Sequence, residues 1–121
     1  MIFIKGNVGS SKNGRQWTGK YSVASKTCQK YYKTSEPCWK SVNNKEAFHK
    51  MLKGKTAPYY VEFTFVRGTK HKFDYINPCQ TVQDLMVKYK WLTDDNADEI
   101  IPVFKPYQYD KENPGVYIKV L

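Results

Sequence analysis

The clearest periodic pattern in the chain lies between residues 59 and 66, where aromatic or apolar side chains occupy every second position. Tyr59, Val61, Phe63 and Phe65 form one set, and the positions between them form the other. Because successive side chains of a strand point to opposite faces, this alternation predicts a strand with one face in the core. Shorter apolar runs predict strands over residues 2–5, 100–104 and 116–120.

A spacing of three and four residues replaces this alternation in two segments and predicts two helices. In the first, Asn43 and Glu46 resemble a capping box before an apolar face that ends at Gly54, and the same periodicity reaches back toward residue 37. In the second, Asn77 is placed as the N-cap and Pro78 at the first helical position. Apolar positions 82, 85, 86 and 89 extend this helix to about residue 90.

These elements predict an α+β fold, in which a small mixed β-sheet of about four strands carries two principal helices packed on it. A chain of 121 residues supports one ordinary core, so we expect a single domain over residues 1–121. Residues 1–35 are expected to be basic and loop-rich, because glycine, serine and asparagine interrupt regular structure there, and residues 36–121 to form the core.

Composition favours a cytoplasmic protein without a membrane segment. No apolar run approaches the roughly 18 residues of a membrane span, and the opening residues have no basic leader followed by an apolar stretch. Cys28, Cys38 and Cys79 lack the paired short spacings of a zinc site and are odd in number, so three reduced thiols are expected.

Charge is distributed unevenly along the chain, whose formal net charge is +9. Residues 1–72 hold 15 Lys and Arg against three acids, whereas residues 73–121 hold five against eight. A basic surface attracts phosphate, and a localised set of carboxylates is what a hard cation requires. The asymmetry therefore favours a nucleic-acid-binding protein, and we expect phosphate contacts from Lys12, Arg15, Lys20, Lys70 and Lys72.

Aromatic residues are interleaved with the lysines of the amino-terminal part, among them Trp17, Tyr31 and Tyr32. Such residues can stack on bases, which would suit a binder of single-stranded nucleic acid or RNA. Core packing explains the two tyrosines equally well, and both interpretations stay open at this point.

Three aspartates carry the chemistry that we expect of the acidic part. Asp74 lies where an extended segment meets the second predicted helix, and Asp94 and Asp95 follow the far end of that helix. Magnesium takes carboxylate oxygens and needs only one or two of them beside substrate phosphates, and Asn77 could orient a ligand or a water. His71 is expected to contact phosphate or lie on the surface, since no Cys or Ser forms a nucleophile arrangement with it.

The order of these residues resembles the RusA-type Holliday-junction resolvases. The resemblance is carried by Phe73-Asp74-x-x-Asn77, the helix that follows, the pair Trp91-Leu92, and Asp94-Asp95, with Asp95 21 positions after Asp74. The segment at residues 9–13 is similar to the amino-terminal Pro-Ser-x-Asn segment of that family.

The resemblance implies a phage-type, divalent-metal-dependent endonuclease that resolves Holliday junctions or other branched DNA by phosphodiester hydrolysis in recombination and repair. It implies Mg²⁺ or Mn²⁺ as the cofactor and DNA as the partner. Asp74, Asp95 and Asn77 would be the catalytic residues, with Asp74 and Asp95 as metal ligands and Asp94 in support.

Two positions depart from the family pattern, because Ile76 stands where a second Asp is expected and Gln80 where a lysine is expected. Asp94, Asp98, Lys70 and Lys72 are the groups that could compensate. The alternative function is a non-catalytic junction-binding protein with a degenerate metal site, in which the carboxylates cap helices and turns.

Helix geometry adds a condition to the metal site. A helix from residue 78 to about residue 90 is roughly 20 Å long, so Asp74 and Asp95 start at opposite ends of it. They meet only if the chain doubles back or if a second subunit supplies one of them. We therefore expect a homodimer, whose two-fold symmetry also suits two symmetric cuts in a four-way junction.

Overall fold

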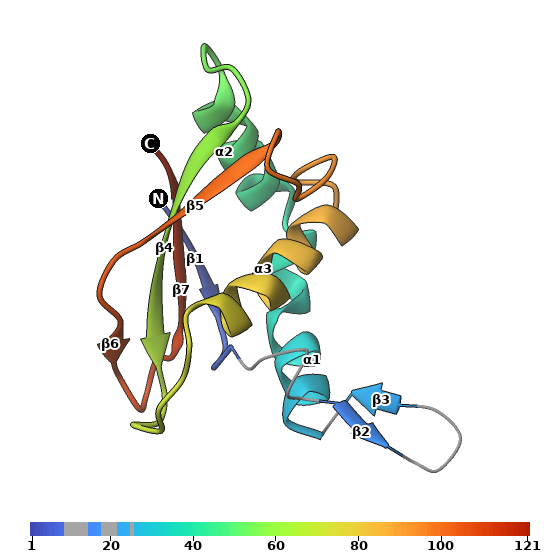
Figure 1. Cartoon of the computed structure of the whole chain (residues 1–121), viewed down its shortest axis with the longest axis vertical. Coiled ribbons are helices and arrows are strands. Elements are labelled where there is room, and N and C mark those ends of the chain that lie inside the picture. The colour runs from blue at the N-terminus through green and yellow to red at the C-terminus, as the bar shows by residue number, and fades with distance from the viewer. Residues whose placement is uncertain (9–14, 18–21, 25) are drawn as a thin grey trace.

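The protein is a mixed β-sheet with three helices on one of its faces (Figure 1). This is a computed structural model that describes residues 1–8, 15–17, 22–24 and 26–121; for residues 15–17, 22–24, 26 and 27 only the backbone is described. The α+β prediction is confirmed, with three helices in place of two.

The main sheet has five strands and is built around β4. Neighbouring strands run in the order β1 (Ile2–Lys5), β7 (Gly115–Val120), β4 (Tyr59–Arg67) and β5 (Ile100–Phe104), and β6 (Gln108–Tyr109) pairs with the end of β4. The β1–β7 and β7–β4 pairs are antiparallel, while β5 and β6 are parallel to β4. A separate two-stranded sheet joins β2 (Arg15–Trp17) to β3 (Ser22–Ala24).

All four predicted strands are present. In β4, burial alternates from Tyr60 to Phe63, whereas Thr64 and Val66 on the other face are buried as well. Val61, Phe63 and Phe65 are fully buried on the side of the sheet that faces the helices, whereas Tyr60 on the other side is 53% exposed. Because β5 is parallel to β4, the chain must cross from one end of the sheet to the other between them, and the intervening helix makes this crossing.

The helices are α1 (Lys26–Lys40), α2 (Val42–Leu52) and α3 (Ile76–Lys88). Helix α1 corrects the expectation of a loop-rich part up to residue 35. Its buried positions Cys28, Tyr31, Ser35 and Trp39 recur at intervals of three and four residues, which is the spacing of one helix face. Tyr31 is therefore a core residue and is not a base-stacking platform.

The starts of α2 and α3 also differ from the predictions. Ser41, in an extended conformation, caps α2 by accepting a hydrogen bond from the Asn44 amide at 3.2 Å. In α3 the backbone becomes helical before the expected N-cap, because the Asn77 amide already donates to the Asp74 carbonyl at 3.1 Å. Asn77 consequently lies in the first turn of α3.

One hydrophobic cluster joins the sheet to the three helices and includes residues from Ile2 to Val120. Trp39 of α1 and Trp91, just after α3, form its largest pair, with ring centroids 5.1 Å apart. The indole N–H of Trp91 donates to the Trp39 carbonyl at 3.0 Å. Among the residues described, no helix has both the length and the apolar character needed to cross a membrane.

Candidate functional site

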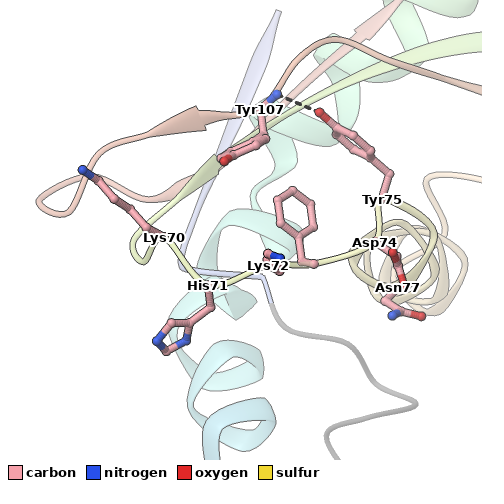
Figure 2. A pocket seen from close by; sticks show the side chains of 8 residues that line it. Lys70, His71, Lys72, Asp74, Tyr75, Asn77 and Tyr107 are labelled. Atoms are coloured by element: carbon pink, nitrogen blue, oxygen red, sulfur yellow. Dashed lines mark hydrogen bonds between the residues drawn. The ribbon is translucent and has the colours of Figure 1, made fainter.

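A cleft of about 520 Å³ opens where the chain leaves β4 and enters α3 (Figure 2). Most of its lining comes from this connecting segment, and one residue comes from the connection between β5 and β6: Lys70, His71, Lys72, Phe73, Asp74, Tyr75, Asn77 and Tyr107. Figure 2 shows Lys70 and His71 at one end of the cleft and Asp74 and Asn77 at the other.

Aromatic side chains fix the shape of the cleft. The Phe73 ring meets Tyr107 edge-on, with centroids 5.1 Å apart, and meets Tyr75 at 5.3 Å. The backbone N–H of Tyr107 donates to the Tyr75 hydroxyl at 2.9 Å, a bond drawn in Figure 2. The connecting segment before α3 is thus held to the connection after β5 by ring contacts and a hydrogen bond.

Arg67, the last residue of β4, packs against Phe73 and so supports the cleft. Its guanidinium carbon lies 4.3 Å from the centre of the Phe73 ring, and Nη1 donates to the Val8 carbonyl. The side chain is only 9% exposed, no described carboxylate forms an ion pair with it, and its burial lowers the pKa of the guanidinium. A positive charge that is nearly buried without an acid beside it raises the electrostatic potential of this region.

Positive side chains outnumber negative ones at the mouth of the cleft. Lys70 and Lys72 are exposed, as predicted for phosphate contacts, and Lys70 lies 4.9 Å from the centre of the Tyr109 ring. Asp74 is the one carboxylate among the lining residues, and it is exposed at the start of α3 beside Asn77. The helix N-terminus places backbone N–H groups and a partial positive charge at the same end.

Asp94 and Asp95 lie elsewhere, in the loop after α3. The Asp94 carboxylate is occupied by its own loop, because one oxygen accepts from the Asp95 amide and the other from the Asn96 side chain, each at 2.8 Å. Its observed role is therefore to shape the turn. Neither residue lines the cleft that contains Asp74.

The loop nevertheless returns along α3. Burial raises the pKa of the Asp95 carboxyl, and the nearby charge of Asp84 raises it further. Burial also raises the pKa of the Cys79 thiol to about 12, with a smaller contribution from the Asp95 charge. Since Cys79 lies in the first turn of α3, the chain doubles back in the direction that a site shared by Asp74 and Asp95 would need.

Within residues 1–8 and 28–121, whose side chains are described, no three His, Cys, Asp or Glu residues come together as a possible metal site. Asp74 and Asn77 supply oxygen donors in one cleft, which fits the demand of magnesium or manganese for few protein ligands. The structure thus brings Asp74 and Asn77 together and leaves Asp94 and Asp95 apart from them.

Other predicted site residues are placed as follows. Lys12 and Lys20 lie outside the described residues, and of Arg15 only the backbone, at the start of β2, is described. At the two positions that depart from the family pattern, Ile76 is 73% exposed and the Gln80 amide donates to Asp84 at 2.8 Å.

The sequence analysis missed Arg67, Phe73, Tyr75 and Tyr107 as parts of the site. A basic residue at the end of a buried strand was a usable signal for Arg67, since such a charge must find polar or aromatic partners. Tyr107 gave no local signal, because it reaches the cleft only through the pairing of β5 and β6 with β4.

No protein-family model matches the chain, and the comparison with curated proteins gives no match. The resemblance to RusA-type resolvases therefore stays a prediction that depends on the spacing of Asp74, Asn77 and Asp95.

Proposed function

We propose that the chain is a divalent-metal-dependent DNA endonuclease of the Holliday-junction-resolvase type, acting on branched DNA at the cleft before α3. The observation that carries this proposal is the position of Asp74. It is the sole carboxylate lining a cleft whose other charged side chains are Lys70, Lys72 and, when protonated, His71. Lysine side chains that can bind phosphate and a carboxylate that can bind a hard metal ion thus line the same cleft.

Each group has a distinct part in this proposal. Lys70 and Lys72 neutralise backbone phosphates next to the reacting one, and Arg67 adds a fixed positive potential through Phe73. Asp74 and Asn77 hold Mg²⁺ or Mn²⁺. The metal, when bound, polarises the phosphodiester and lowers the pKa of a coordinated water. The rigid ring contacts of Phe73, Tyr75 and Tyr107 keep these groups in position.

A homodimer fits this proposal, because a four-way junction presents two equivalent strands for cutting. Asp95 enters the site in one of two ways. The loop after α3 closes further toward Asp74 when metal and DNA bind, or a second copy supplies the carboxylate across a two-fold axis.

The alternative function is a junction-binding protein that does not cut. It is favoured by the two hydrogen bonds that occupy the Asp94 carboxylate and by the lack of a three-ligand group among the described side chains. The basic and aromatic lining of the cleft serves this function equally well.

Cleavage of a labelled four-way junction with and without Mg²⁺ tests the proposal. We expect Mg²⁺-dependent cutting that Asp74→Asn abolishes while junction binding persists. Glu46→Gln is the control, because Glu46 is exposed on α2, lies outside the cleft and loses the same charge. Cutting that survives in both Asp74→Asn and Asp95→Asn rejects the assignment, and binding without cutting by the unchanged protein establishes the alternative.

A further inference from the structure

The face of the main sheet opposite the helices carries aromatic and basic side chains that the proposed endonuclease site does not use. Within the described part of the chain, α1, α2 and α3 all lie on the other face (Figure 1). Strand alternation assigns Phe3, Tyr117 and Tyr60 to this helix-free face, because their sequence neighbours Ile2, Ile118 and Val61 are buried in the core.

The aromatic part of this face centres on Tyr117. Phe3 and Tyr117 are directly opposite each other in the β1–β7 pair, and their ring centroids are 4.7 Å apart. Gly115 leaves the space that the Phe3 ring occupies, since a Cβ built there would lie 2.3 Å from the tip of that ring. Both side chains are half-buried, so part of each stays exposed on a surface that no described helix covers.

Basic side chains surround this aromatic pair. Lys5 and Lys119 are two residues beyond Phe3 and Tyr117 on the same face, and both are exposed. Lys119 and Lys105 line a hollow of about 330 Å³ together with Tyr117, Gln108 and Glu62. Glu62 is the one acid in this lining, and its contact with Lys105 is long, at 3.8 Å. The face therefore has an excess of positive charge beside an aromatic surface.

This combination excludes most partners on chemical grounds. A purely apolar partner would leave Lys119 and Lys105 desolvated without compensation, which is costly. A purely anionic surface would make no use of the Phe3–Tyr117 pair. Unpaired nucleic acid satisfies both, because its bases present π-faces and its backbone presents phosphates.

We propose that the helix-free face of the sheet binds unpaired nucleic acid, with a base stacked on Tyr117 beside Phe3 and phosphates on Lys119, Lys105 and Lys5. This surface is separate from the cleft at Asp74. Arg67, which supports that cleft, belongs with Val61, Phe63 and Phe65 to the set of β4 side chains that point to the helix side. One molecule can thus hold a single strand on one face and a duplex phosphate on the other.

Fluorescence anisotropy with a labelled oligothymidylate of about ten nucleotides tests this proposal on the full chain. We expect Tyr117→Leu to weaken binding about fivefold or more, since stacking on one aromatic side chain contributes strongly to single-strand affinity. Tyr117→Phe keeps the ring and is expected to retain the affinity. Thermal unfolding of both variants shows whether each retains the fold.

Lysine substitutions give a second readout that does not disturb the core. Lys119→Gln is expected to reduce the slope of log affinity against log salt concentration by about 0.7, the value for one phosphate contact on a single strand. Lys50 is an exposed residue of α2, away from this face. Lys50→Gln removes the same charge there and is expected to leave the slope unchanged. Lys72→Gln tests the competing location: if the oligothymidylate binds in the cleft, this variant loses affinity and Lys119→Gln does not.

Several outcomes overturn the proposal. They are a lack of oligothymidylate binding, equal losses from Tyr117→Leu and Tyr117→Phe in folded protein, or a loss confined to Lys72→Gln. Sedimentation equilibrium adds one more: a dimer that Tyr117→Leu dissociates, with unchanged oligothymidylate affinity, assigns this face to a second copy of the chain. The result is independent of the endonuclease proposal, because Asp74→Asn is expected to abolish cleavage and leave binding by this face intact.

Discussion

The carboxylate of Asp95 lies close enough to the Cys79 thiol for its charge to raise the thiol pKa, although Cys79 is in the first turn of α3 and Asp95 lies beyond its last turn. This proximity arises because Trp91 and Leu92 both donate their amides to the Met86 carbonyl, at 2.8 and 3.3 Å, which ends the helix and reverses the chain. The backbone at Lys90, with φ of 64°, completes this reversal. The loop that carries Asp95 therefore follows α3 backwards.

This position predicts that the charge of Asp95 destabilises the folded protein at neutral pH. Burial and the charges of Asp84 and Asp94 raise the pKa of Asp95 above its ordinary value. The folded state then binds a proton more tightly than the unfolded state, so this contribution to stability is present at low pH and is lost as pH rises through the interval between the two pKa values. We expect Asp95→Asn to increase the free energy of unfolding at pH 7.

Urea unfolding at pH 7 and at about pH 3 measures this effect, because the variant and the unchanged protein should converge once Asp95 is protonated. Asp98→Asn is the control for loss of one exposed negative charge. Equal stability changes in the two variants at pH 7 would contradict the explanation from crowded carboxylates.

Lys70 and Lys72 are predicted to contribute to junction binding through phosphate contacts. Each substitution to Gln should weaken binding and reduce the slope of log affinity against log salt by about 0.9, the value for one duplex phosphate contact. Lys50→Gln should leave the slope unchanged, because Lys50 is on α2 and outside the cleft. Titration of a labelled four-way junction at several salt concentrations gives the slopes, and a slope that neither cleft substitution alters would remove these lysines from the interface.

Arg67 is predicted to stabilise the cleft through two contacts that a flexible amine cannot reproduce. Its Nη1 donates to the Val8 carbonyl while the guanidinium carbon lies over the Phe73 ring, 4.3 Å from its centre. Arg67→Lys keeps the charge and should still lower the free energy of unfolding by about 1–3 kcal/mol, measured by urea denaturation. Unchanged stability in this variant would show that charge alone matters at this position.

Trp91 is predicted to hold the loop after α3 against α1. Trp91→Phe retains an aromatic ring but leaves the Trp39 carbonyl without its donor, at an expected cost of about 1–3 kcal/mol. Trp91→Ala also removes the ring contacts with Trp39 and Phe48 and should cost about 3–5 kcal/mol. Differential scanning calorimetry of the two variants separates the hydrogen bond from the packing, and similar midpoints for both would contradict this division.

Local patterns predicted the sheet well because the strands have strongly one-sided burial. The alternation between residues 59 and 66 needs no tertiary information, but burial in β4 follows it only from Tyr60 to Phe63, because Thr64 and Val66 on the other face are buried as well. Helix α1 was missed because Ser35 is a polar member of its buried face and lysines dilute the apolar positions. The apolar pattern over residues 26–40 was therefore too weak to predict the helix that forms there.

The candidate site was predictable only where it is local. Lys70, Lys72, Asp74 and Asn77 lie close together in sequence and share one cleft. Tyr107 depends on the register of β5 and β6 along β4, and the return of Asp95 depends on the hydrogen bonds at Met86. Both positions depend on contacts between distant parts of the chain, so residue spacing in the sequence could not predict them.

The position of β7 between β1 and β4 has a consequence for synthesis on the ribosome. Strand β1 is synthesised before β4, yet the strand that pairs with both begins only at Gly115. Until residues 115–120 leave the exit tunnel, the Ile2–Lys5 segment has no sheet partner, and one edge of β4 is open. The apolar side chains of β1 therefore stay without a sheet partner until β7 has been synthesised, and an unpaired apolar strand of this kind is prone to aggregation during folding.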